Sequence, residues 1–184
     1  MLFSAIYYEP KPELLSKARD ALDNFIKSGI NPFIAYSLPY KLYAHEIAKM
    51  LNAPIAPGPP ITGCFIQFPI PNTVLFIGSG YFYPLTFKLL RPPQANVYLF
   101  DVFRGVIENV DDVYRRYLAM KVKAIQDFDN ARSVGIIISR KPGQYRPDLI
   151  EALINRLRRL GKEFVIIDLN EVSPDYVNNL PWML

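Results

Sequence analysis

The apolar residues of this chain recur at two alternating spacings. Short continuous runs rich in β-branched and aromatic residues predict strands, and apolar residues three and four positions apart predict helices. The predicted strands cover residues 2–8, 33–36, 73–77, 96–101, 134–139 and 164–169, and the predicted helices cover residues 11–28, 40–51, 82–90, 111–131 and 148–160. Such alternation is typical of an α/β protein in which helices cover a parallel sheet.

Glycine and proline support several of these boundaries. Gly29 and Gly161 directly follow predicted helices, where a glycine commonly forms the C-cap. Pro84 lies in the first turn of the helix predicted for 82–90, a position that proline tolerates well. Ser173 and Pro174 together predict the start of another short helix, with serine as its N-cap.

The strand-helix-strand pattern restarts after the helix predicted for 111–131. We therefore expect a Rossmann-like domain over residues 1–110, followed over 111–184 by a connecting helix and a partial βαβ subdomain. Two strands make a poor independent sheet, so we expect them to pack on the first domain or on another chain. This unfinished sheet and the uncharged surface predict a homo-oligomer, specifically a dimer.

Composition narrows the class of protein. Of the 184 residues, 51% are hydrophobic, which is enough to bury a core and argues against a disordered chain. The single cysteine excludes an internal disulfide and favours a cytoplasmic location. The first eight residues lack the basic segment of a signal peptide.

Positive charge is concentrated in one part of the chain. The net charge of +4 does not by itself indicate nucleic-acid binding, and we do not expect a nucleic-acid partner. Only Asp148 and Glu151 oppose the basic residues of the segment 132–159, which are Arg132, Arg140, Lys141, Arg146, Arg156, Arg158 and Arg159. This cluster is either a solvated helix face with its loop or a site for an anionic group.

A long uncharged stretch occupies residues 50–87, which contain no Asp, Glu, Lys or Arg. Seven prolines interrupt it, and because proline breaks helices the stretch cannot be a membrane-spanning helix. We therefore expect no membrane association, and we expect this backbone to be wrapped inside the protein or against a partner.

Cys64 lies within the uncharged stretch and has two interpretations. A lone cysteine is usually an inert, small buried hydrophobe. Between rigid prolines and beside a glycine, its thiolate would instead suit a metal or cluster ligand or a nucleophile. A nucleophile needs a base, and the only histidine, His45, falls with Lys41 and Lys49 on the polar face of its helix. We expect His45 to be solvated, and one cysteine with one histidine cannot build a zinc site.

Two glycine-containing loops follow predicted strands. Gly78-Ser79-Gly80 lies between an apolar strand and a helix, where open α/β sheets bind ligands and where backbone amides approach an anion or nucleoside. It lacks the complete G-x-G-x-x-G pattern and a Walker lysine, so it is equally interpreted as a tight turn. The loop Lys141-Pro142-Gly143-Gln144 occupies the equivalent position in the second unit and carries the same two interpretations.

Taken together, these segments resemble the archaeal diphthamide synthase family. Residues 58–64 (GPPITGC) resemble the Gly-Gln-x-x-Gly-Cys segment that carries the cluster cysteine of the middle domain. Residues 76–84 resemble the family's Ile-Gly-x-Gly-x-Phe-His-Pro. Residues 115–131 and 135–144 resemble the helix and strand that open its last domain, whereas residues 2–56 match only in the order of elements.

The resemblance implies a specific chemistry. Each of the family's three related α/β domains contributes one cysteine to a central [4Fe–4S] cluster. The enzyme, a transferase, cleaves S-adenosylmethionine and moves its 3-amino-3-carboxypropyl group to a histidine of translation elongation factor 2. Residues 1–110 would correspond to the middle domain and 111–184 to the first part of the last domain. By resemblance, Cys64 would be a cluster ligand, and the S-adenosylmethionine pocket would include Gly78, Ser79, Gly80, Lys141, Gly143 and Gln144.

The chain also departs from the family pattern. Tyr83 replaces the family's usual histidine, Pro59 replaces glutamine, and the cysteines of the first and last domains have no counterpart. Because such clusters normally take four ligands, mostly cysteines, we expect this chain to complete the site with other chains. A full-length diphthamide synthase homologue and elongation factor 2 are the expected partners. The alternative is a non-catalytic accessory or ligand-binding module without a cluster, and no residue is singled out as catalytic.

Overall fold

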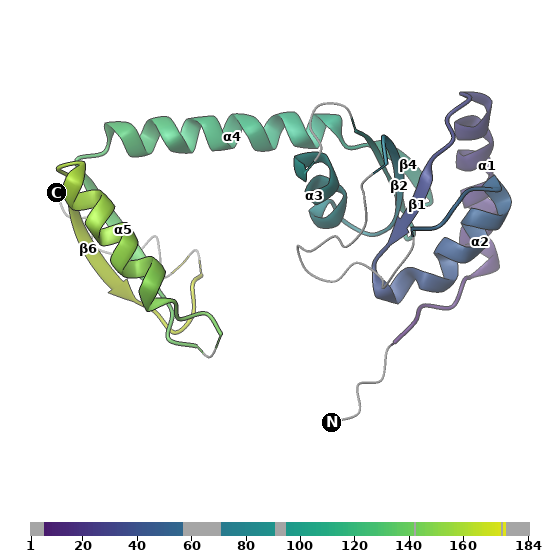
Figure 1. Ribbon diagram of the computed structural model, residues 1–184. Helices are drawn as coiled ribbons and strands as arrows, with labels where there is room; N and C mark the ends of the chain where they lie inside the picture. The colour runs from purple at the N-terminus through teal and green to yellow at the C-terminus, as the bar shows by residue number, and fades with distance from the viewer. Residues whose placement is uncertain (1–5, 57–70, 91–94, 142, 174, 176–184) are drawn as a thin grey trace. The chain divides into compact units, whose positions relative to one another are not determined.

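A computed structural model describes residues 6–56, 71–90, 95–141, 143–173 and 175 (Figure 1). The chain divides into two compact units, residues 1–119 and 120–184, and the division falls within the 20-residue helix α4 (Asp111–Asn130). The described residues include no helix with the length and apolar character that a membrane crossing requires.

The first unit is built on a four-stranded sheet in the order β1-β2-β3-β4. Three strands run parallel: β1 (Phe33–Tyr36), β2 (Thr73–Gly78) and β3 (Asn96–Asp101). The fourth, β4 (Val106–Asn109), is antiparallel to β3. The predicted α/β class with a parallel sheet is confirmed. Strand β4 was not predicted, because its four residues carry only two apolar side chains and follow a tight turn at Gly105.

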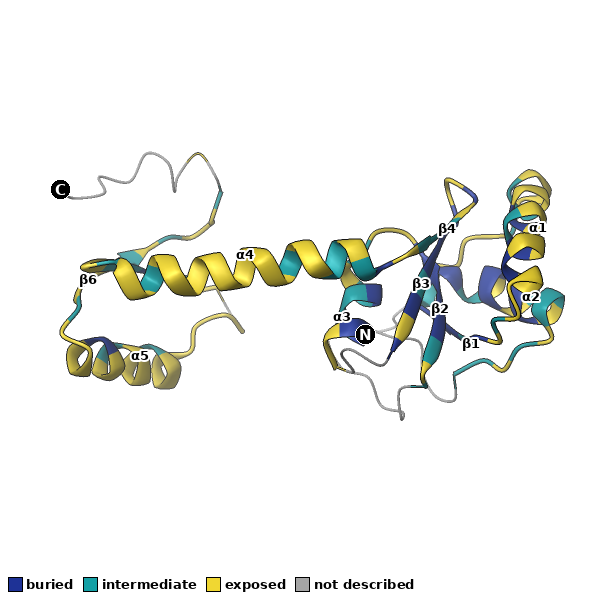
Figure 2. Ribbon diagram, turned by 90° about the horizontal axis from the view of Figure 1, so that it is seen from above, coloured by how far each residue is buried: buried dark blue, intermediate teal, exposed yellow. Residues whose placement is uncertain are grey.

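Helices cover both faces of this sheet. One face packs against α1 (Pro12–Lys27) and α2 (Lys41–Leu51). The other face packs against α3 (Phe82–Leu90). A short 3-10 helix, η1 (Leu38–Tyr40), directly precedes α2. Each face of the sheet carries its own hydrophobic core because side chains alternate along a strand. Leu75 and Ile77 of β2 belong to the core on the side of α1 and α2. Val74 and Phe76 belong to the core on the side of α3, together with Phe87. In Figure 2, β2 and β3 are mostly dark blue, the colour of buried residues.

A buried lysine connects α3 to the start of α4. The side chain of Lys88 is only 5% exposed, and its ammonium donates to the carbonyl of Ala95 at 2.6 Å. The same nitrogen lies 2.8 Å from Oδ1 of Asp111, the first residue of α4. A buried charge is tolerated only when it is paired in this way, so Lys88 anchors the helix beginning at Asp111.

The prediction of a strand over residues 2–8 is wrong for the part that the structure describes. Residues 6–10 have no regular secondary structure, and residues 1–5 lie outside the described residues. The backbone N–H of Tyr8 donates to the carbonyl of Pro39 instead of to a strand, and its ring packs on Tyr40 and Phe103. Residues with high β-propensity have side chains that suit a half-buried surface of any kind. In this segment, the ring of Tyr8 finds such a surface on the aromatic rings of Tyr40 and Phe103, so no strand is needed.

The helix boundaries marked by glycine and proline agree with the structure. Gly29 and Gly161 have positive φ angles after α1 and α5 (Pro147–Arg159), and Pro84 lies in the first turn of α3. The short helix predicted from Ser173 and Pro174 falls largely on residues outside the described part of the chain.

The second unit contains the parallel pair β5 (Ser133–Ile138) and β6 (Glu163–Asp168), connected through α5. Among its described residues, Ile136 and Leu157 are the only buried ones. Lys162 donates to the carbonyls of Asp129 and Ala131, so its positive charge caps the C-terminal end of α4. The apolar face expected on α4 is not buried among the described residues, and Met120 is 71% exposed.

Candidate functional site

The carboxyl ends of β2 and β3 form the candidate site of the first unit. Gly78 ends β2 and is paired with Asp101, the last residue of β3. Ser79 and Gly80 follow as an exposed turn, and α3 begins two residues later. Ligands of open α/β sheets bind beyond the carboxyl ends of parallel strands, so the turn lies where such a ligand would approach.

Glycine is required at both positions of this turn, by a neighbouring side chain at Gly78 and by the backbone angle at Gly80. A β-carbon at Gly78 would lie 2.7 Å from a ring carbon of Phe76, which is far inside van der Waals contact. Gly80 has φ +71°, in the left-handed region that side-chain-bearing residues rarely adopt. The turn is therefore a specific conformation that other residues would strain.

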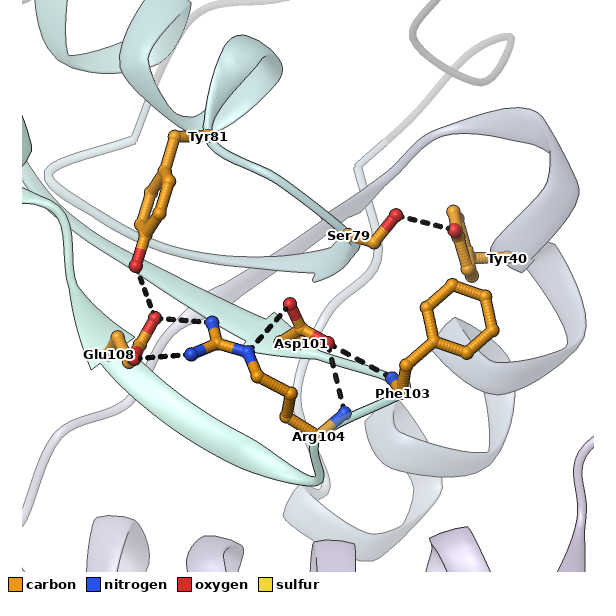
Figure 3. Close-up of polar contacts among 7 residues, drawn as sticks. All are labelled: Tyr40, Ser79, Tyr81, Asp101, Phe103, Arg104 and Glu108. Carbon is orange, nitrogen blue, oxygen red and sulfur yellow. Dashed lines mark hydrogen bonds and ion pairs between the residues drawn. The ribbon is translucent and has the colours of Figure 1, made fainter.

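One flank of the turn is held by Tyr40. Its hydroxyl lies 2.7 Å from the Ser79 hydroxyl, and either group is able to donate in this hydrogen bond (Figure 3). The ring of Tyr40 packs against Tyr8 at 5.3 Å between ring centroids and against the edge of Phe103 at 6.1 Å. An aromatic group thus positions the serine hydroxyl at the rim of the sheet.

The other flank is held by a network of charged residues, shown in Figure 3. The hydroxyl of Tyr81 donates to the carboxylate of Glu108. The guanidinium of Arg104 donates to both oxygens of that carboxylate, at 2.9 and 2.7 Å, and its Nε lies 3.1 Å from Oδ2 of Asp101. The other oxygen of Asp101 accepts hydrogen bonds from the backbone N–H groups of Phe103 and Arg104.

This network shifts three pKa values in consistent directions. Hydrogen bonds from Arg104 and then from Tyr81 lower the pKa of Glu108. The hydrogen bond to Glu108, together with burial, raises the pKa of Tyr81. The hydrogen bonds to Glu108 and Asp101 raise the pKa of Arg104. The network joins two carboxylates and one guanidinium, so it carries one excess formal negative charge beside the turn.

The lowered pKa of Glu108 predicts an acid-dependent loss of stability. A carboxyl group whose pKa is lower in the folded state stabilises the fold above its unfolded value and loses that contribution as the pH falls through the folded value. We therefore expect Glu108→Gln to destabilise the first unit at pH 7, and this difference from the wild type to shrink as the pH falls through the lowered pKa of Glu108. Urea unfolding at several pH values would measure it, and a pH-independent difference would contradict the assignment.

The predicted site residues of the second unit lie in the loop between β5 and α5. Lys141, Gly143 and Gln144 are exposed there, and the N–H of Gln144 donates to the carbonyl of Lys141 at 3.0 Å. The structure thus places Gly78, Ser79 and Gly80 together in one unit, and Lys141, Gly143 and Gln144 together in the other. The role of both sets in binding a ligand stays a prediction.

Three of the seven basic residues in the segment 132–159 form ion pairs. Arg132 pairs with Glu163, and Arg146 pairs with Asp148. Arg140 pairs with Asp168 at the end of β6. For these three arginines, pairing with a surface carboxylate favours the interpretation of a solvated surface over that of an anion site.

The remaining candidates from the sequence lie elsewhere. Cys64 is outside the described residues. His45 is exposed on α2, as predicted, and lines a hollow of about 500 Å³ that includes none of the turn residues. The described residues hold no group of three His, Cys, Asp or Glu side chains suited to a metal ion.

Five residues of the site were not identified from the sequence: Tyr40, Tyr81, Asp101, Arg104 and Glu108. The one available signal was Asp101, a charged residue that directly ends an apolar strand. The partners Tyr40 and Ser79 are 39 positions apart, and Tyr81 and Glu108 are 27 apart, so no local pattern connects them.

Comparison with known proteins gives one consistent family. The model of the diphthamide synthesis protein family matches residues 6–183. The chain is 30% identical over 110 residues to 2-(3-amino-3-carboxypropyl)histidine synthase subunit 1 of Homo sapiens, covering 60% of this chain and 25% of that protein. It is 21% identical over 170 residues to 2-(3-amino-3-carboxypropyl)histidine synthase of Methanocaldococcus jannaschii, covering 91% and 47%.

Solved structures agree at the level of fold. Two crystal structures of Dph2 from Pyrococcus horikoshii, one of them with a 4Fe-4S cluster, superpose with a TM-score of 0.71 at 20% identity. They match 91% of this chain, which covers 53% and 52% of those chains. The chain therefore spans between a quarter and about half of the length of these relatives.

Proposed function

This chain belongs to the diphthamide synthesis protein family, and we propose that it is one component of a 2-(3-amino-3-carboxypropyl)histidine synthase. In this role it binds S-adenosylmethionine at the carboxyl edge of the first sheet, and the assembled enzyme transfers the 3-amino-3-carboxypropyl group to a histidine of elongation factor 2. The observation that carries the proposal is the exposed Gly78-Ser79-Gly80 turn, held on both flanks at the position where α/β sheets bind ligands.

The proposed role assigns the two parts of the chain to different domains of the family. Residues 1–110 take the place of the Rossmann-like middle domain, and residues 111–184 take the place of the first part of the last domain. Support comes from the separate parallel pair β5–β6 after the long helix α4, and from the family match that runs through both parts.

The chemistry of the turn suits this ligand. Backbone amides at a glycine turn approach a ligand closely, and the Ser79 hydroxyl offers a further hydrogen bond. S-adenosylmethionine carries a positively charged sulfonium, which the excess negative charge of Asp101, Glu108 and Arg104 favours. Lys141, Gly143 and Gln144 are proposed as S-adenosylmethionine contacts on the family resemblance.

The residues of this chain do not by themselves fit a four-iron cluster. The chain has one cysteine, and a [4Fe–4S] cluster takes four ligands that are mostly cysteines. We assign Cys64 the role of one ligand, with the others supplied by a longer homologue, because a second copy of this chain, as in a dimer, would add only one more cysteine. The alternative of a ligand-binding module without a cluster has no observation that favours it.

A pair of glycine variants tests the ligand site. Gly80 and Gly29 have nearly equal φ angles, +71° and +72°, and a β-carbon meets no atom within 4 Å at either position. Gly80→Ala and Gly29→Ala should therefore each cost about 1 kcal/mol of stability. We expect only Gly80→Ala to weaken S-adenosylmethionine binding, by about tenfold, because only that turn faces the ligand.

Isothermal titration calorimetry of the wild type and both variants measures this difference. Absence of binding to the wild type would contradict the proposed ligand. Equal binding by the two variants would remove the turn from the site.

A further inference from the structure

Arg104 is connected to Tyr81, the residue after the glycine turn, through the carboxylate of Glu108, and a cation at this edge of the sheet suggests a role in binding a ligand carboxylate. The contacts indicate another role. We infer that Glu108 is a positioning residue that fixes the Gly78-Ser79-Gly80 turn through Tyr81, and that Arg104 orients Glu108 rather than a ligand. The functional consequence rests on the proposed function, because the turn is the proposed S-adenosylmethionine site.

The turn has few restraints of its own. Ser79 and Gly80 are exposed, and Gly80 has the wide conformational freedom of a residue without a side chain. Side-chain hydrogen bonds act immediately beside it: Ser79 bonds to Tyr40, and Tyr81 bonds to Glu108. The bond to Glu108 holds Tyr81, which lies between Gly80 and the start of α3 at Phe82. It therefore determines where the Gly78-Ser79-Gly80 turn ends.

Glu108 is a rigid reference point for this bond. It lies on β4 and is paired with Leu99 of the central strand β3, so the sheet rather than the turn fixes its backbone. Its carboxylate accepts two hydrogen bonds from Arg104 in addition to that from Tyr81. A bidentate contact of this kind sets the orientation of the carboxylate as well as its charge.

Arg104 is committed to carboxylates of the protein. Both of its terminal nitrogens donate to Glu108, and its Nε lies 3.1 Å from Asp101. Asp101 is in turn held by backbone N–H groups of the turn between β3 and β4. The guanidinium therefore faces two negative charges, and a ligand carboxylate at the same place would be repelled by both.

Hydrogen exchange of the ligand-free protein tests the positioning role. The amides to follow are those of Val102 and Leu85, which donate to the carbonyls of Gly78 and Tyr81 and are called the turn amides below. We expect Tyr81→Phe to accelerate their exchange about tenfold, because it removes a hydrogen bond to a charged group. Glu108→Gln should accelerate the same amides less, since its amide oxygen still accepts from Tyr81. Amides in the middle of β2 should be unaffected in both variants. Asp112→Asn, which removes an exposed ion pair with Arg115, is the matched control and should change none of these rates.

The role of Arg104 is tested by combining variants. If Arg104 acts through Glu108, Arg104→Gln accelerates the turn amides as Glu108→Gln does, and the double variant adds little to either single variant. If Arg104 contacts the ligand instead, Arg104→Gln weakens S-adenosylmethionine binding and leaves turn exchange unchanged, which would overturn the inference.

Ligand affinity provides the second measurement. Tyr81→Phe should weaken S-adenosylmethionine binding by about as much as it accelerates turn exchange, while Asp112→Asn should bind as the wild type does. If the wild type does not bind this ligand, the proposed function fails, yet exchange still decides the positioning role. Turn amides that exchange equally in Tyr81→Phe and wild-type protein would overturn the positioning role itself.

Discussion

Replacing Phe87 with alanine is expected to lower the free energy of unfolding of the first unit by about 3–5 kcal/mol. Phe87 of α3 is completely buried and packs on Phe76 of β2, with 6.1 Å between ring centroids. Its removal leaves a cavity between the helix and the sheet, because rigid strand residues such as Val74 and Val97 collapse only partly into it.

Phe82 provides the control for this prediction. It lies on the same helix but is 60% exposed, so Phe82→Ala should change stability by no more than about 0.5 kcal/mol. Urea unfolding followed by circular dichroism measures both variants. Similar values for the two would show that α3 does not pack on the sheet as described, and the turn before α3 would lose its support.

The second large effect concerns iron. Reconstituted alone under anaerobic conditions, the chain should retain no stable four-iron cluster, because a single cysteine supplies only one of four ligands. Mixed with a full-length family homologue whose middle-domain cysteine has been replaced, it should restore about four iron atoms per complex. The Cys64→Ser variant should restore none.

Ser79→Ala is the matched control for the cysteine variant. It leaves the thiol in place, so it should restore iron as the wild-type chain does. Iron and sulfide analysis of the complex isolated by gel filtration gives the readout. Restoration by Cys64→Ser, or no restoration by the wild type, would contradict the proposed ligand. The second outcome would favour a non-catalytic module, which predicts stabilisation by S-adenosylmethionine without turnover.

Most secondary structure of the described residues was predictable because it depends on local spacing. The run from Val74 to Ile77 is continuously apolar, as expected of a parallel strand covered on both faces, and β2 is buried at every residue after Thr73. Helices α1 and α5 carry apolar residues at helical spacing and end where a glycine follows. In these segments propensity, pattern and capping all favour one structure.

Two segments of the first unit were not predictable in this way. Residues 6–8 have strand-forming side chains, but Tyr8 packs its ring on Tyr40 and Phe103 and joins no sheet. Strand β4 has a weak local pattern and exists because Val106–Asn109 pairs with β3 after the tight turn at Gly105. In both cases contacts between distant parts of the chain override local preference.

The sequence by itself determined the α/β class, the glycine turn after an apolar strand, and the family likeness, because each depends on residue type and spacing along a short segment. Only the tertiary structure decided which side chains hold that turn. Tyr40 and Glu108 reach it from a 3-10 helix and an antiparallel edge strand, far from it along the chain. Hydrogen bonds act over about 3 Å in space, and separation along the chain does not encode that distance.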